Sequence, residues 1–302
     1  MHKLGLIIID EQHRFGVEQR KKLQAKAGHM PHVLHMTATP IPRSLALTLY
    51  GELDVSILDE LPAGRKKIIT EIHSPNSRAQ LNAKIEKELE AGRQMFVVTP
   101  LIADSETSAG LSVEEVYKRL SQREFKHRRV GLLHGRLKST EKDRIMQQFV
   151  NHELDILVST TVIEVGVDVP NASIMLIEGP ERFGLAQIHQ LRGRVGRGEH
   201  QSYCYIVLSD SRAPSDRLRA LETTSDGFKL AELDLRLRGP GAIYGTFQHG
   251  ALDLRVASLT DMKLIAAARG AAQSFIEKGE NLKKYPHLAL RAEALRAVTN
   301  LN

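Results

Sequence analysis

The chain has 302 residues, of which 42% are hydrophobic and 26% charged, and this composition is typical of a folded protein rather than a disordered or fibrous one. Its formal net charge of +6 favours a polyanionic partner. The sequence has no apolar run near the roughly 18–20 residues of a membrane span and no signal-peptide pattern. Its one cysteine, Cys204, is too few for a disulfide scaffold or a cysteine-based zinc site. We therefore expect a protein of a reducing compartment without a membrane partner.

Short apolar segments alternate with amphipathic stretches along most of the chain, and this alternation is typical of an α/β fold with a parallel sheet. Strands are predicted over residues 4–9, 33–36, 94–99, 130–133, 155–159, 173–178 and 203–208.

Helices are predicted from capping signals and apolar spacing. Thr140 and Asp143 resemble a capping box, and the apolar residues up to Phe149 follow at helical spacing, so a helix should start at Thr140. Further helical stretches cover residues 215–223, 227–237 and 262–275, and we expect the last of these to pack against the chain rather than to bind a partner.

Residues 61–67, Leu-Pro-Ala-Gly-Arg-Lys-Lys, have no apolar periodicity and are typical of a linker, so we place a domain boundary near residue 64. Residues 1–64 contain too few strands to bury both faces of a parallel sheet and should be the end of an incomplete lobe. Residues 65–210 have strands and helices enough for a complete lobe. Residues 211–302 should form a helical hairpin, a glycine-rich loop and a helical tail.

The strand over residues 4–9 ends in two carboxylates, Asp10 and Glu11, followed by Gln12 and His13. This arrangement suits a nucleotide hydrolase, because the first acid can hold Mg²⁺ and the second can orient the attacking water. The alternative, an acid pair that merely ends a strand, stays open at this point.

Residues 187–198 interleave Arg192, Arg194 and Arg197 with three glycines. Glycine allows close approach of the backbone to a phosphate group, and arginine suits bidentate binding of its oxygens. A solvated basic loop is the alternative, but it would not require such regular alternation.

Four segments resemble motifs II, III, V and VI of superfamily 2 helicases and translocases: DEQH at 10–13, TATPIPR at 37–43, LVSTTVIEVGVD at 157–168 and QLRGRVGR at 190–197. Three further segments resemble the RecG-type branch-migrating DNA helicases: LDELPAGR at 58–65, RFGLAQIHQ at 182–190, and RGPG at 238–241 with GTFQHG at 245–250. The last is similar to the TRG motif, which this family shares with the transcription-repair coupling translocase. The resemblance implies RecA-like parallel-sheet lobes, the end of lobe 1 and a complete lobe 2.

The resemblance also implies ATP and Mg²⁺ as cofactors. Asp10 would hold Mg²⁺, Glu11 would be the catalytic base, and Arg194 and Arg197 would approach the γ-phosphate, with Arg197 as the arginine finger. The motif V residues expected near the nucleotide sugar and phosphates are Gly166 and Asp168. The residues expected at the nucleic acid are Thr99, Pro100, Gly135 and Thr160. The residues expected to couple hydrolysis to movement are Gln12, His13, Thr37, Thr39, Gln190, Arg238 and Gln248.

The family's P-loop pattern is missing, because the dipeptide Gly-Lys does not occur in the chain. We therefore expect a C-terminal fragment, inactive alone, of a cytoplasmic helicase whose N-terminal part supplies the P-loop and a DNA-splitting wedge domain. The complete protein would be a monomer that acts on branched double-stranded DNA, such as stalled forks and four-way junctions, in recombination and repair. Two alternatives remain: a non-catalytic DNA-binding or regulatory module derived from a helicase, and a fragment of the transcription-repair coupling translocase.

Overall fold

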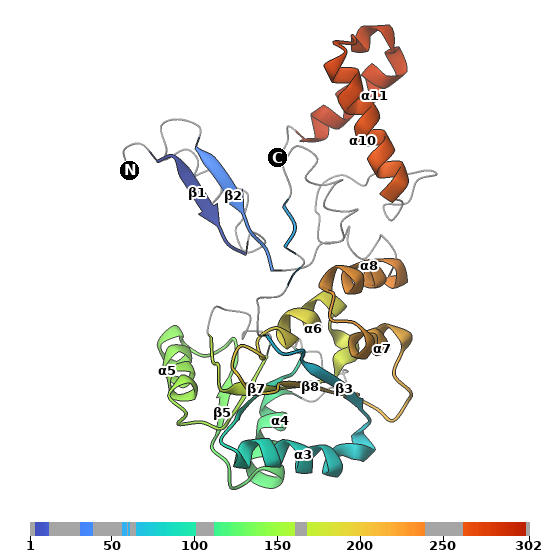
Figure 1. Ribbon diagram of the computed structural model, residues 1–302. Helices are drawn as coiled ribbons and strands as arrows, with labels where there is room; N and C mark the ends of the chain where they lie inside the picture. Colours follow the sequence, from blue (N-terminus) through green and yellow to red (C-terminus); the bar gives the residue numbers. More distant parts are fainter. Residues whose placement is uncertain are drawn as a thin grey trace. The chain divides into compact units, whose positions relative to one another are not determined.

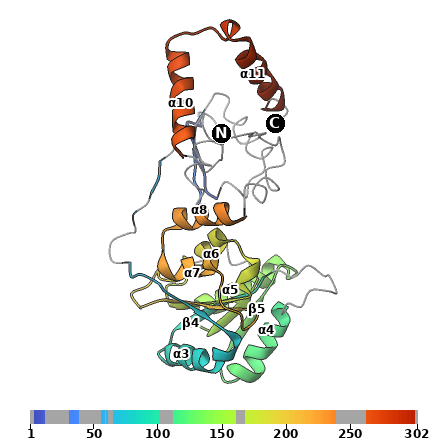
Figure 2. The ribbon, with the colours of Figure 1, turned by 90° about the vertical axis from the view of Figure 1, so that its right-hand side faces the viewer.

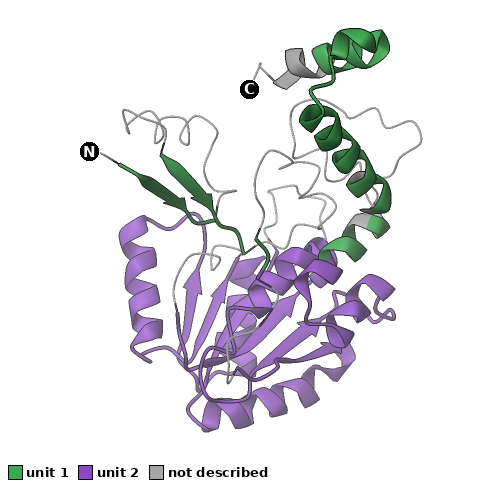
Figure 3. Cartoon of the chain, turned by 45° about the horizontal axis from the view of Figure 1, so that its top comes forward, with its two compact units in different colours: residues 1–57, 231–302 green, residues 58–230 purple. Residues whose placement is uncertain are grey.

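The computed structural model describes residues 4–11, 31–38, 56–58, 60, 65–100, 112–160, 168–238 and 262–299 (Figure 1). The chain divides into two compact units, residues 1–57 with 231–302 and residues 58–230 (Figure 3). The three-part division expected from the sequence, with boundaries at residues 64 and 210, stays a prediction.

The larger unit contains a six-stranded sheet in which every neighbouring pair is parallel, in the order β3-β8-β7-β4-β6-β5. Parallel sheets bury both faces, and the central strands β4, β6 and β7 are buried at every position. The strands are β3 (Ile69–His73), β4 (Gln94–Val98), β5 (Val130–Leu133), β6 (Ile156–Ser159), β7 (Ala172–Glu178) and β8 (Tyr203–Val207).

Helices cover both faces of this sheet (Figures 1 and 2). One face packs against α3 (Arg78–Glu90), α4 (Val113–Arg119) and the short π-helix η3 (Leu120–Glu124). The other carries α5 (Ser139–Val150), α6 (Leu185–Arg192) and α7 (Asp216–Thr223). The 3₁₀ turns η2 (Pro75–Ser77) and η5 (Pro180–Arg182) precede α3 and α6, and α8 (Gly227–Arg238) follows α7.

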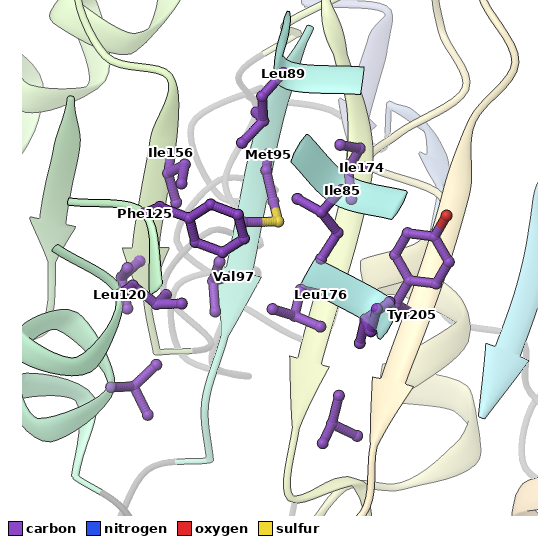
Figure 4. Packing of buried hydrophobic residues seen from close by; sticks show 14 of the residues in the cluster. Ile85, Leu89, Met95, Val97, Leu120, Phe125, Ile156, Ile174, Leu176 and Tyr205 are labelled. Carbon is purple, nitrogen blue, oxygen red and sulfur yellow. The ribbon is translucent and has the colours of Figure 1, made fainter. Parts of the chain in front are cut away.

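The core between the sheet and the first helical layer follows from two periodicities (Figure 4). Leu81, Ile85 and Leu89 recur every four residues on α3 and form one apolar stripe. Met95 and Val97 alternate along β4 and face that stripe. The other core residues shown in Figure 4 and labelled there are Leu120, Phe125, Ile156, Ile174, Leu176 and Tyr205.

A ring of four charged side chains ties β7 to this helical layer. Arg78 Nη1 and Arg119 Nη2 both lie 2.6 Å from Glu178 Oε1. The same two arginines also contact the carboxylate of Glu124. Arg78 Nη2 lies 2.9 Å from its Oε2, and Arg119 Nε lies 3.0 Å from its Oε1. Each charge therefore has two partners of opposite sign, which a half-buried ion group requires.

The smaller unit contains a parallel pair of strands, β1 (Leu6–Ile9) and β2 (His32–His35). Two further helices lie in it, α10 (Met262–Glu277) and α11 (Pro286–Thr299), joined through the 3₁₀ turn η6 (Leu282–Lys284). Phe275 and Tyr285 make an edge contact between them, with ring centroids 5.5 Å apart. No helix among the residues that the structure describes is long and apolar enough to cross a membrane.

The strand predictions are confirmed, since all seven strands form within two residues of their expected ends. The sequence interpretation missed β3, whose residues Ile69–His73 were read as the region after a linker. The helices over 215–223, 227–237 and 262–275 also form. The described side chains of α10 are exposed except for the half-buried Phe275, and the packing expected for this helix stays a prediction.

The capping box predicted at Thr140 is wrong. The N-cap of α5 is Lys138, in extended backbone, and no side chain caps this helix. The chain turns just before it, with Leu137 N donating to His134 O at 3.2 Å, so the helix starts early and Thr140 lies within its first turn. The capping box of this unit is at α4, where the Ser112 hydroxyl accepts from Glu115 N and the Glu115 carboxylate accepts from Ser112 N.

Candidate functional site

The acid pair Asp10 and Glu11 follows β1 directly. Asp10 Oδ1 accepts a hydrogen bond from Glu11 N at 2.9 Å, and Glu11 has a φ of 49°, in the left-handed region that non-glycine residues rarely occupy. Met36 N donates to Ile9 O at 2.8 Å, so the ends of β1 and β2 lie together. Asp10, Glu11 and Thr37 therefore share the carboxyl edge of this pair of strands.

Asp10 fits the magnesium role that the resemblance implies. Mg²⁺ takes oxygen ligands and is commonly held by one or two carboxylates, with water and substrate phosphates completing its shell. Asp10 is exposed at the strand end. The described part of the chain has no group of three or more His, Cys, Asp or Glu side chains that could hold a metal. The donor set thus suits a magnesium ion that shares its ligands with a nucleotide.

The loop after α6 carries the arginines expected at the γ-phosphate. Gly196 has a φ of +78°, and a Cβ there would lie 3.0 Å from Ile68 Cγ1. A Cβ on Gly198 would lie 2.4 Å from the carbonyl oxygen of Pro170, which no larger residue allows without backbone movement. Glycine is therefore needed at these two positions for the loop to pack closely. Arg197 lies between these two glycines and is exposed. Arg194 lies two residues before Gly196 and is half-buried.

The structure brings together two residues that were predicted from separate motifs. Arg197 Nη1 lies 3.6 Å from Asp168 Oδ1, and the two side chains are 37% and 58% exposed. An ion pair so exposed contributes little to stability. The proximity nevertheless shows that the ends of motifs V and VI meet at the surface.

Arg192, the first arginine of the same motif, has a different environment. It is 4% exposed, and its Nη1 donates to the carbonyl oxygens of Leu221 at 3.0 Å and Thr224 at 3.1 Å. Its Nη2 lies 2.8 Å from Nδ1 of His189. Burial, followed by the charge of Arg192, lowers the pKa of His189 to about 4, so the imidazole is neutral and accepts this hydrogen bond. Arg192 therefore joins α6 to the end of α7 and does not face a ligand.

Three of the residues expected at the nucleic acid follow three neighbouring strands. Thr99 follows β4, Thr160 follows β6, and Gly135 lies just after β5. Thr99 N donates to Ser159 O at 2.9 Å, and both threonine side chains are buried, with hydroxyls that have no hydrogen-bond partner among the described residues. Gly135 is exposed, and Pro100 is half-buried next to Thr99. Their contacts with nucleic acid stay a prediction.

The remaining expected residues are described only in part. Gln190 is half-buried on α6, and Arg238 is the last residue of α8, with a side chain that is not described. Residues that lie outside the described ranges are Gln12, His13, Thr39, Gly166 and Gln248.

One residue of the site was missed. Arg65, read from the sequence as part of a linker, donates hydrogen bonds to the backbone of the arginine loop. Arg65 ends the segment over residues 58–65 that resembles RecG-type helicases, but neither this resemblance nor any spacing points to the arginine loop, so only the structure reveals the contact.

Two family models match the chain. The model described as the helicase conserved C-terminal domain matches residues 79–199, and that described as ATP-dependent DNA helicase RecG, domain 3, C-terminal, matches residues 224–301. The ATP-dependent DNA helicase RecG of Synechocystis sp. is 52% identical over 291 residues, and that of Bacillus subtilis is 48% identical over 297 residues. The chain is homologous to RecG.

The homology covers nearly all of this chain and a smaller share of each RecG. The aligned residues make up 96% of the chain and 35% of the Synechocystis protein, and 97% of the chain and 43% of the Bacillus protein. A solved structure of RecG bound to a three-way DNA junction is 47% identical, with a TM-score of 0.66, and covers 87% of this chain and 33% of that chain. The RecG match and the six-stranded parallel sheet confirm the α/β, RecA-like fold predicted from the sequence.

Proposed function

We propose that the chain is the part of a RecG-type, ATP-dependent DNA helicase that carries the catalytic acid pair and the arginine finger. The observation that carries the proposal is the meeting of Arg197 with Asp168 at a surface loop, within a chain homologous to RecG. The chain spans 35% and 43% of the length of the two relatives, so the P-loop and wedge would come from a longer protein.

In this proposal each side chain has a defined task in ATP hydrolysis. Glu11 takes a proton from the attacking water. Arg197 stabilises the negative charge that develops on the γ-phosphate, with Arg194 beside it. Asp10 would hold Mg²⁺, which when bound neutralises charge on the phosphates. Asp168, which lies 3.6 Å from Arg197, would approach the nucleotide sugar and phosphates.

Branched double-stranded DNA is the proposed substrate. The net charge of +6 is consistent with a nucleic-acid partner, and the RecG structure that resembles this chain holds a three-way DNA junction. The strand ends that carry Thr99, Thr160 and Gly135 would line the DNA path. Recombination and repair, a cytoplasmic location and a monomeric complete protein belong to the same proposal.

The segment over residues 238–250 would convert movement of the motor into movement along duplex DNA. It resembles the TRG motif, and Arg238 and Gln248 would be its coupling residues, together with Gln12, His13, Thr37, Thr39 and Gln190. The family match over residues 224–301 favours RecG over the transcription-repair coupling translocase, because this model is specific to RecG.

The test uses a complete helicase, made by joining this chain to the N-terminal part of the Synechocystis RecG. We expect DNA-stimulated ATP hydrolysis and regression of a model fork. Gln248→Ala should abolish regression while most of the hydrolysis remains. Binding of branched DNA with no hydrolysis would instead support the non-catalytic module, and equal loss of both activities in Gln248→Ala would contradict the coupling role.

A further inference from the structure

Arg65 forms a clamp on the backbone of the arginine loop. Its Nε donates to the carbonyl oxygen of Gly196 at 3.1 Å, and its Nη2 donates to that of Gly193 at 3.2 Å and approaches that of Val195 at 3.5 Å. Gly193 and Val195 flank Arg194, and Gly196 directly precedes Arg197. A single half-buried guanidinium therefore contacts the peptide units on which both arginines are mounted.

The clamp supplies hydrogen-bond donors to carbonyl groups of the loop. The loop amides are bonded to the end of α6, with Arg194 N donating to Leu191 O at 3.0 Å and Val195 N donating to Arg192 O at 3.3 Å. Those bonds use the N–H groups of the loop, so its carbonyl groups need donors from elsewhere. Buried carbonyl groups rarely lack a hydrogen-bond donor. Arg65 supplies these donors from a planar fork, which an ammonium group cannot imitate.

Neighbouring contacts fix the segment that carries Arg65. Ile68 lies against Gly196, where a Cβ would be 3.0 Å from Ile68 Cγ1. Gln201 Nε2 donates to Lys67 O at 2.8 Å. Residues 65–68 are thus held against the loop at several points, and Arg65 makes the polar part of that contact.

We infer that Arg65 is a positioning residue for Arg194 and Arg197. It acts through the carbonyl groups of the loop and holds the two guanidinium groups where they can approach a phosphate. This inference rests on the function proposed above for the two arginines.

The first experiment measures amide hydrogen exchange in the 302-residue chain, where no nucleotide is needed. Arg65→Ala should raise exchange of the amides of residues 193–197 by about tenfold or more, and leave α3 and β4 protected. Arg65→Lys should restore part of the protection. The matched control is Arg128→Ala, because Arg128 is likewise half-buried and approaches a backbone carbonyl, that of Leu89, away from the loop. Unlike Arg65, it also pairs with a carboxylate, that of Glu86. Unchanged exchange of these amides in Arg65→Ala would overturn the inference. If Arg65→Ala does not fold, Arg65→Lys is tested instead, and it should exchange these amides faster than the wild type; unchanged exchange there would equally overturn the inference.

The second experiment separates this inference from the proposed function. In the complete helicase, Arg65→Ala should lower kcat by about 10- to 100-fold with KM for ATP changed less than about threefold, because misplaced groups affect the transition state more than binding. Arg65→Lys should recover part of kcat. If Arg197→Ala abolishes hydrolysis and Arg65→Ala does not alter it, the positioning role is wrong. If Arg197→Ala itself hydrolyses ATP normally, the proposed function is wrong, while the exchange result still stands.

Discussion

The arginines of one short motif have separate tasks because of where each side chain points. Arg192 lies at the end of α6 and turns inward to the carbonyl groups of Leu221 and Thr224. Arg197 follows a glycine in the left-handed region and is exposed next to Asp168. A change of backbone direction at Gly196 therefore separates a structural arginine from one that is available to a ligand.

Glu11 gives the first prediction at this scale. In the complete helicase, Glu11→Gln should lower the ATP turnover number by about 10²- to 10⁴-fold, the range expected for loss of a positioned base. Affinity for ATP should change little, because the amide has almost the same size as the carboxylate. Parallel measurement of turnover and of fluorescent nucleotide binding tests this. Near-normal turnover would remove Glu11 from the base role.

His189 gives a prediction about pH. Its folded-state pKa is lowered to about 4 by burial and then by Arg192, below the value of about 6.5 expected in the unfolded chain. The unfolded state therefore binds more protons between these values, and stability is lost as the pH falls from about 6.5 towards 4. This one group should cost roughly 2–3 kcal/mol of unfolding free energy over that window.

Urea unfolding of the chain at several pH values tests the effect of His189. His189→Gln keeps a hydrogen-bond acceptor for Arg192 but cannot be protonated, so its stability should fall less steeply below pH 6.5. His152→Gln is the control, because His152 is 41% exposed. Parallel pH profiles of the wild type and His189→Gln would show that the imidazole does not titrate in this way.

At the scale of elements, the ring of Arg78, Glu124, Arg119 and Glu178 connects β7 with α3, α4 and η3. Burial alone would lower the pKa of Arg78, but the carboxylates of Glu178 and Glu124 raise it, so the guanidinium stays charged. The side chain of Glu178 is only 7% exposed. Loss of this carboxylate would leave two guanidinium groups near each other with one counter-charge.

Glu178→Gln should therefore lower the free energy of unfolding by about 2–4 kcal/mol, the effect expected when one partner of a largely buried ion group is removed. Asp210→Asn is the matched control, because the pair of Asp210 and Arg212 has a similar 2.6 Å contact but is 45% and 88% exposed. This control should not move the unfolding midpoint. A similar midpoint for Glu178→Gln and the wild type would mean that the ring contributes no net stability.

The success of sequence-based prediction for each strand depended on how apolar its residues are. Central strands such as β4 and β7 are apolar throughout, because both faces are covered, and their positions were predicted well. The missed strand, β3, is at the edge of the sheet and includes Thr70, Glu71 and His73, so its composition resembles a loop. The capping signal at Thr140 failed because a preceding turn started α5 earlier.

The candidate site residues were assigned where chemistry depends on residue type and spacing, and their roles stay predictions. Asp10, Glu11, Arg194 and Arg197 were assigned from motifs, and the structure adds the contact of Arg197 with Asp168. Spacing alone could not show that Arg192 points inward, because that depends on the position of α7. It also could not assign Arg65, whose role is set by carbonyl groups more than a hundred residues away along the chain.

At the scale of the whole molecule, we propose that this chain supplies the base and the arginine finger of the motor, and that the phosphate-binding loop comes from another part of a longer protein. Gly-Lys does not occur in its sequence, and amides of a P-loop with its lysine are the usual cradle for the β- and γ-phosphates. The chain also spans well under half of its relatives. These observations predict that ATP hydrolysis requires the longer protein.

The most direct test is DNA-stimulated phosphate release, measured for the 302-residue chain alone, for the complete helicase and for its Arg197→Ala variant. The chain alone should release no phosphate above background, and the complete helicase should be stimulated by branched DNA. Arg197→Ala should lower turnover by about 10³-fold or more, because an arginine finger acts on charge that develops only as the phosphoryl group departs. Stimulated hydrolysis by the chain alone, or normal turnover in Arg197→Ala, would contradict the claim.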